Sequence, residues 1–380
     1  LASIMCAAFS PGGGGTPASY SLNSTDPNAF LYEAKPQIDA YAAHVYAAYT
    51  AAAADARKLE AAVETLLATP TDETLAAART AWVAARPAYL RTEVFRFYDG
   101  PIEEIEGRIN AWPLNESFID YVEGSPGAGL INDTAKPMTL DAITGANQVT
   151  DEADVTTGWH AIEFLLWGQD LSAEGPGNRP VSDFVAGQGS YDRRRDYLRL
   201  VTQLLVSDLD TLAAAWSPGI PDNYAATFAA LPQREALGRI VNGMAVLAGF
   251  EFMSERLAVA LDSGDQEDEH SCFSDTTHQD FVYDLAGIRD VWSGVDGAPS
   301  IAALAAERDA AAAAEVDAAL SDAEANIAAL GDPWDKVLAQ PKGTPERDKA
   351  EAAVAALARL GAALKAAGTK LGVLVQIPDA

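Results

Sequence analysis

The stretch PQIDAYAAHVYAAYTAAAADARKLEAAVETLLATP, residues 36–70, decides the fold class. Its apolar residues recur three and four positions apart from Ile38 to Leu67, and the pattern ends at Pro70. This period belongs to one face of an α-helix, so we predict a long amphipathic helix. A second helical pattern begins at Thr71, and its apolar face holds Leu75, Ala78, Trp82, Ala85 and Tyr89. Two long helices joined by a Thr-Pro-Thr turn predict an antiparallel hairpin.

The rest of the chain extends this helical pattern. Residues 99–155 are rich in Gly, Pro and Asn, and we expect an irregular insertion with short helices there. Helical spacing returns at residues 197–212 and at 237–257, ending near Gly264. Alternating β-branched runs are nearly absent, so the predicted fold class is all-α.

The domain organisation follows from these segments. We predict two packed helical-bundle domains, residues 34–190 and 191–380, after a signal remnant and flexible linker at residues 1–33. The alanine-rich pair of helices expected at 301–330 and 347–368 repeats the plan of the first hairpin. A distant internal duplication is therefore one interpretation; shared alanine-rich composition is the other.

Charge and cysteine content exclude several classes of function. The 380 residues carry a formal net charge of −29, which repels phosphate backbones and so excludes nucleic-acid binding. Residues 1–15 resemble the end of a secretory signal, whereas the sequence around Cys6 fits a lipoprotein signal poorly. Cys272 is the only other cysteine, so a disulfide framework is excluded. No run of eighteen apolar residues follows the start, and we predict an exported soluble protein.

The segment GWHAIEFLLWG, residues 158–168, combines apolar residues in every helical direction with two ionisable ones. A helix that is apolar all round is buried on all sides. His160 and Glu163 are three residues apart, so their side chains lie on nearly the same face. Because burying an unpaired carboxylate costs several kcal/mol, Glu163 must meet a cation, a metal or a donor, or be protonated. The pair is therefore a candidate metal site or, alternatively, a buried structural hydrogen bond.

Two further segments carry candidate ligands. The segment EDEHSCFSDTTHQD, residues 267–280, is the densest group of potential ligands in the chain, although a solvated acidic loop would have the same composition. The segment RPAYLRTEVFRFYDGP, residues 86–101, places Glu93 among arginines, where it either pairs within its helix or serves as a third ligand. His44 lies in the first amphipathic helix and is interpreted as structural.

These segments together resemble the imelysin family. The resemblance rests on GxHxxE at Gly158, His160 and Glu163, on INAWPL and FLLWGQD, and on the two ligand-rich segments above. It covers most of residues 34–290 and fits the alanine-rich helices more loosely. It implies an all-α fold of two bundles with the GxHxxE helix near their interface. It also implies an exported, periplasmic or outer-membrane-associated protein with a link to iron uptake, and attaches a peptidase activity by name.

The leading interpretation is a binding protein that holds iron or another divalent metal, or a metal-bearing ligand, at the domain interface. His160, Glu163 and Glu93 are its predicted metal ligands. The residues expected to line the site are Gly158, Arg86, Tyr89, Arg96, Glu269, His270, Ser274, Asp275 and His278. Its expected partners are the metal ion and membrane-bound iron-transport components, and a monomer is favoured.

Two alternatives stay open. One is a metallopeptidase, for which the sequence offers little support because it contains neither HExxH nor a nucleophile with a recognisable base. The other is a docking protein in which His160 and Glu163 only form a buried structural contact. The sequence therefore favours a binding protein over an enzyme.

Overall fold

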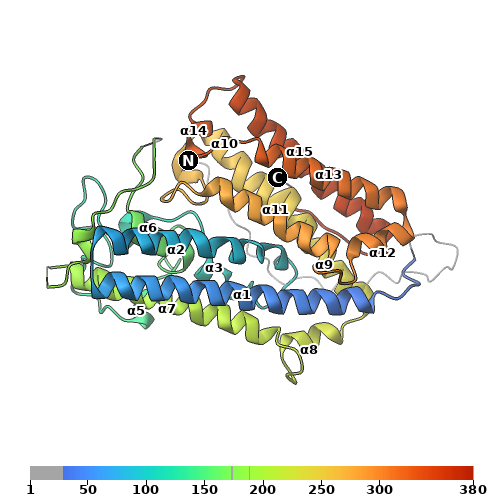
Figure 1. Cartoon of the computed structure of the whole chain (residues 1–380), viewed down its shortest axis with the longest axis horizontal. Coiled ribbons are helices and arrows are strands. Elements are labelled where there is room, and N and C mark those ends of the chain that lie inside the picture. Colours follow the sequence, from blue (N-terminus) through green and yellow to red (C-terminus); the bar gives the residue numbers. More distant parts are fainter. Residues whose placement is uncertain (1–28, 173, 188, 380) are drawn as a thin grey trace.

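The computed structural model describes residues 29–172, 174–187 and 189–379, and within them the fold is helical (Figure 1). The β pairing among these residues is a single isolated bridge between Val122 and Ser125. The all-α prediction is therefore confirmed. The predicted signal remnant, Cys6 included, lies outside the described residues.

The first bundle is built on the predicted hairpin of α1 (Lys35–Ala68) and α2 (Asp72–Leu90). Thr71 caps α2, because its hydroxyl accepts the Thr74 amide at 3.2 Å and its own amide donates to the Thr74 hydroxyl at 3.0 Å. Helix α7 (Tyr191–Ala215) lies along α1, and α6 (Gly158–Trp167) packs against both α2 and α7. Short helices occupy the predicted insertion and its surroundings: η1 (Glu93–Phe95), α3 (Glu106–Ile109), α4 (Glu116–Ile119), α5 (Leu140–Thr144) and η2 (Val181–Phe184).

The second bundle contains one long composite helix. Helix α9 (Gln233–Val246) continues through the π-helical η3 (Leu247–Ala258) into α10 (Val259–Ser263), whose C-cap is Gly264, near the predicted end. Helix α11 (Thr277–Ser293) packs on α13 (Ala310–Ala328), and α13 packs on α15 (Pro345–Lys370). The smaller helices are α8 (Tyr224–Ala229), η4 (Gln266–Asp268), α12 (Ile301–Arg308) and α14 (Asp335–Leu338).

The two bundles form two layers, with α1, α2 and α7 below and α9, α11, α13 and α15 above in Figure 1. Helix α11 reaches across the boundary and contacts α2 and η1. Helix α7 packs with α1 and α6, although the sequence boundary after residue 190 groups it with the second half. We therefore propose that the domain boundary falls between α8 and α9. The internal duplication stays a prediction.

Helix α15 qualifies the expectation of no membrane span. It is the one described helix whose length and mean hydropathy would allow a crossing. In the structure it packs against α13, α9 and η3, and its Gly361 lies so close to η3 that an added Cβ would be 2.7 Å from the Cα of Gly249. These contacts are those of a core helix in a bundle.

Asp120 anchors the irregular insertion to α7. Its carboxylate accepts hydrogen bonds from Arg179 at 2.8 Å and from Arg194 at 2.6 and 2.9 Å, and all three side chains are buried. Burial alone would raise the pKa of Asp120, but the two guanidinium groups hold it below the ordinary value of 3.8. The insertion is therefore fixed by a buried ion cluster as well as by apolar packing.

Asp120→Asn should lower the free energy of unfolding at neutral pH by about 3–5 kcal/mol, because it leaves two buried guanidinium groups without their carboxylate. The carboxylate contributes fully above its unfolded pKa and loses that contribution as the pH falls through the lower folded pKa. The difference between wild type and variant should therefore shrink on acidification to about pH 3. Urea unfolding at both pH values measures it, with the exposed Asp262→Asn as control. A difference that is the same at both pH values would contradict the assignment.

Candidate functional site

Helix α6 is enclosed by protein along its whole length. All ten of its residues are buried, which confirms the prediction from its all-round apolar sequence. Residues of α2 satisfy its polar backbone: the Trp82 indole donates to the Trp159 carbonyl at 3.0 Å, and Arg79 donates to the Leu166 carbonyl at 3.0 and 2.9 Å. Arg79 thereby satisfies a carbonyl of the last turn, which has no partner within the helix.

Gly158 is required where α6 begins. Its φ is +86°, in the region that disfavours side chains, and a Cβ added there would lie 2.3 Å from the Ile109 carbonyl oxygen. The backbone of α6 therefore starts directly against the end of α3. This contact fixes the start of the helix two residues before His160, whose side chain is buried.

His160 and Glu163 are in contact, as their spacing predicts. His160 Nδ1 lies 2.8 Å from Glu163 Oε2, and both side chains are fully buried. The other carboxylate oxygen, Oε1, accepts hydrogen bonds from the Ser274 amide at 2.9 Å and the Ser274 hydroxyl at 2.6 Å. His160 Nε2, in contrast, is buried without a hydrogen-bond partner. An unpartnered ring nitrogen in the interior is the kind of atom that a metal ion would satisfy.

Burial controls the charge of this pair. It lowers the pKa of His160 well below 6.5, and the nearby His270 and Arg86 lower it further. It raises the pKa of Glu163 to about 8, although hydrogen bonds from Ser274 oppose the shift. Burial therefore favours the neutral form of both groups. A metal at Nε2 requires Glu163 to give up its proton, so that Nδ1–H donates to the carboxylate and Nε2 keeps its lone pair.

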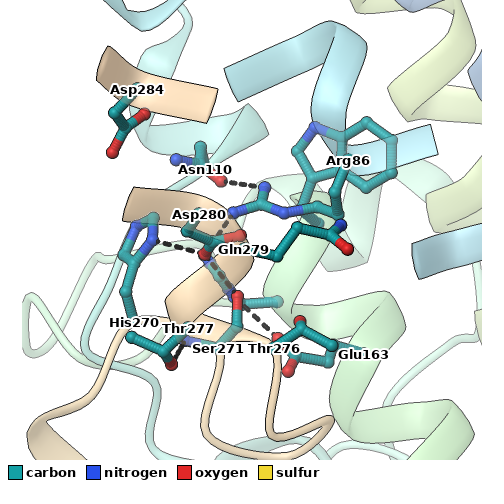
Figure 2. A network of polar contacts seen from close by, with 12 residues as sticks. Arg86, Asn110, Glu163, His270, Ser271, Thr276, Thr277, Gln279, Asp280 and Asp284 are labelled. Atoms are coloured by element: carbon teal, nitrogen blue, oxygen red, sulfur yellow. Dashed lines mark hydrogen bonds and ion pairs between the residues drawn. The ribbon is translucent and has the colours of Figure 1, made fainter. Parts of the chain in front are cut away.

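A second histidine lies beside the first. The rings of His160 and His270 have centroids 4.7 Å apart, and His270 Nδ1 lies 2.9 Å from Asp280 Oδ2. Figure 2 shows that carboxylate between the His270 ring and the guanidinium group of Arg86. Asp280 Oδ2 also accepts hydrogen bonds from Ser271 at 2.6 Å and Arg86 at 3.0 Å. Both imidazoles therefore contact a carboxylate through Nδ1, the arrangement by which proteins orient metal-binding histidines.

The partners of Asp280 keep its carboxyl group ionised. Burial would raise the pKa of Asp280, but Arg86 and His270 lower it to about 2. The carboxylate is therefore ionised at neutral pH. Arg86 is fully buried and also donates to Asn110 Oδ1 at 2.7 Å. These contacts hold the Asp280 carboxylate in place against Nδ1 of His270.

Glu93 belongs to a different set of contacts. Its Oε2 accepts a hydrogen bond from Arg96 at 2.8 Å and pairs with Arg256, which also donates to Asp284 at 2.7 Å. Burial would raise the pKa of Glu93, but Arg96 and Arg256 hold it far below the ordinary range. Two guanidinium groups on one carboxylate leave it ill suited to bind a further cation. The structure therefore offers no support for Glu93 as a third metal ligand.

The remaining predicted residues divide between several places. Tyr89 packs its ring against Trp159, with centroids 5.8 Å apart. His278 Nε2 lies 3.0 Å from the Ile327 carbonyl oxygen of α13, so this histidine joins two helices of the second bundle. Glu269 and Asp275 lie in a separate cluster with Asp170, described below. His44 packs against Phe95, in keeping with a structural role.

Sequence reasoning missed several members of the network. Asp280 and Ser271 stand inside the ligand-rich segment 267–280, where the nearby histidines could have drawn attention to them. Arg256, Asp284 and Asn110 carried no local signal, because their roles depend on how distant helices pack. Trp112 was also missed: its partly buried ring packs against His160 with centroids 5.0 Å apart.

Gly158→Ala should destabilise the fold by at least about 1–3 kcal/mol, the strain of a side chain at positive φ, because the Cβ also collides with the Ile109 carbonyl. Thermal unfolding followed by circular dichroism measures this loss. Gly127→Ala is the matched control, since a Cβ there meets nothing within 4 Å. Equal stability of the two variants would show that the close approach of α6 to α3 is not needed.

Proteins of similar sequence and structure identify the family of this chain. The family model described as imelysin matches residues 45–364. Iron-regulated protein A of Synechococcus elongatus is 26% identical over 326 residues, which cover 82% of this chain and 80% of that protein. A precursor from Parabacteroides distasonis, named after iron-regulated protein A, has a similar structure with a TM-score of 0.70 at 16% identity, covering 93% of this chain and 97% of that one. An imelysin-like protein of Psychrobacter arcticum has a TM-score of 0.64 at 16% identity, covering 91% and 99%. The chain therefore belongs to the imelysin family.

Proposed function

We propose that this chain is an exported iron-handling protein that holds a metal ion between its two bundles, with His160 and His270 as ligands. The observation that carries the proposal is the buried Nε2 of His160, which has no partner while Nδ1 is held by Glu163. Iron is the favoured ion because the relative from Synechococcus elongatus is named as iron-regulated. The ion is cargo in this proposal, to be passed on to membrane-bound transport components.

The donor set fits a divalent transition metal. Two neutral imidazoles suit iron and zinc, and ring centroids 4.7 Å apart allow both side chains to approach one ion. Both oxygens of Glu163 already have partners, so its main role is to orient His160 rather than to bind the ion. Asp280 does the same for His270 and supplies the negative charge. This assignment changes the predicted role of Glu163 from ligand to positioning residue.

The metallopeptidase alternative has weaker support. The side chains of His160 and Glu163 are 0% exposed, so a polypeptide does not reach them in this conformation. Metal-assisted hydrolysis also needs an open coordination position that meets the substrate. An ion or a small chelate fits such an enclosed site better than a peptide bond does.

Export is supported from two sides. The relative from Parabacteroides distasonis is described as a precursor, which agrees with the signal-like start of this sequence. We propose a periplasmic or outer-membrane-associated location on this basis.

His160→Ala should lose one equivalent of bound ferrous iron relative to wild type, because it removes the unpartnered ring nitrogen. Glu163→Gln should weaken binding by about 10–100-fold, since an orienting carboxylate is lost while its shape is kept. Metal content by mass spectrometry and titration calorimetry measure both effects. His44→Ala serves as the histidine control and should bind as wild type. Unchanged stoichiometry and affinity in His160→Ala would overturn the proposal.

The peptidase alternative predicts cleavage that depends on Glu163, and the binding protein predicts none. We expect purified wild-type protein to cleave an unfolded protein substrate no faster than Glu163→Gln does, with or without chelator. Gel electrophoresis of timed digests measures the rates. Chelator-sensitive cleavage that disappears in Glu163→Gln would favour the peptidase over the binding protein.

A further inference from the structure

A second group of potential ligands is formed in part by the loop that carries His270 and Ser274. One ligand atom from each of Asp170, Glu269 and Cys272 lies within 4.8 Å of the other two. The same holds for Asp170, Asp275 and Asp335. We call these five residues the acid–thiol cluster. Neither group contains His160 or Glu163, so this cluster is separate from the histidine site.

Three distant chain segments are held together at the cluster. Asp170 follows the end of α6, Glu269 and Cys272 lie between η4 and α11, and Asp335 begins α14. Gln266 donates to the Asp170 carbonyl at 2.8 Å, and the Gly177 amide donates to the Phe273 carbonyl at 3.0 Å. These two contacts fix the Asp170 segment against the loop that carries Glu269 and Cys272.

Several carboxylate oxygens of the cluster are buried without a hydrogen-bond partner. Glu269 is fully buried and neither of its oxygens has a hydrogen-bond partner. One oxygen each of Asp170 and Asp335, which are 1% and 2% exposed, also lacks a partner. A buried carboxylate with no donor or counterion costs several kcal/mol. Such a cost points to a ligand that supplies the missing contacts.

The cluster lacks an ion pair with a basic side chain. Among the described residues, no Lys or Arg forms an ion pair with Asp170, Glu269, Asp275 or Asp335. Elsewhere in the interior, arginines neutralise the buried carboxylates, because Arg86 pairs with Asp280 and Arg256 pairs with Glu93. Burial therefore raises the pKa of Glu269 to about 9, so its carboxyl stays protonated unless a cation from outside the chain replaces the proton.

We propose that the acid–thiol cluster is a second metal site, which binds a divalent transition-metal cation through Asp170, Glu269 and Cys272. Two carboxylates with one thiolate form a borderline donor set that suits zinc, ferrous iron or cobalt better than magnesium or calcium. Asp275 and Asp335 add oxygen donors around the shared Asp170. This proposal goes beyond the function proposed above and does not depend on it, because the two sites share no ligand.

Cobalt(II) tests the site, because a cobalt–thiolate bond gives a charge-transfer absorption in the near ultraviolet that histidine and carboxylate ligands do not give. Titration of the reduced wild-type protein should produce this band, and in His160→Ala, which lacks the histidine site, the band should saturate at one equivalent. Cys272→Ser should abolish it. Glu269→Gln should weaken the binding that produces it by at least about tenfold, the lower end of what loss of an orienting group costs a metal site.

Two controls separate this site from the first. Glu267→Gln changes an acidic residue of the same loop outside the cluster and should leave the band unchanged. His160→Ala should also leave it unchanged, even if that variant no longer binds iron. Wild-type protein without the band, or a band that persists in Cys272→Ser, would overturn the proposal. An unaltered affinity in a folded Glu269→Gln variant, checked by circular dichroism, would overturn it as well.

Discussion

The buried ion pair between Arg86 and Asp280 is the contact on which the polar interior depends. Both side chains are 0% exposed, and they join α2 of the first bundle to α11 of the second. The guanidinium group of Arg86 also lies 5.4 Å from the ring of Trp82 and 5.5 Å from that of Trp159, which places it beside the first turn of α6. Asp280 in turn holds His270. One ion pair therefore joins the two bundles and also orients the imidazole of His270. Breaking such a pair costs about 3–5 kcal/mol.

Arginine side chains neutralise several of the buried carboxylates of this protein. Asp120, Glu93 and Asp280 are all enclosed, and each accepts hydrogen bonds from at least one guanidinium group. The fork of donors on Arg matches the two oxygens of a carboxylate, so one contact supplies both charge and hydrogen bonds. This explains why several arginines of an acidic chain lie in its interior and at its interface. Glu163 instead has His160 and Ser274 as partners, and Glu269 and Asp170 have no arginine partner either.

The helices could be predicted from the sequence more completely than the candidate site. Periodicity located α1, α2 and the end of the composite helix at Gly264, because burial of one face is a local pattern. The His160–Glu163 contact was also predictable, since helical spacing alone brings the two together. The separation of His270, which lies beside His160, from Glu269 and Asp275, which lie near Asp170, was not. Glu269, His270 and Asp275 lie in a loop whose path includes a positive φ of 56° at Asp275, and only tertiary contacts decide where such side chains point.

The loop between Gly264 and α11 links the two candidate sites physically. His270 and Ser274 contact the network around Asp280 and Glu163, whereas Glu269 and Cys272 belong to the acid–thiol cluster. Neighbouring residues such as Glu269 and His270 cannot move independently, because one peptide bond fixes their separation. A cation that orders the loop through Glu269 and Cys272 would therefore remove conformational freedom that binding at His270 must otherwise remove. Cooperation between the two sites then requires no contact between their ligands, only the shared backbone.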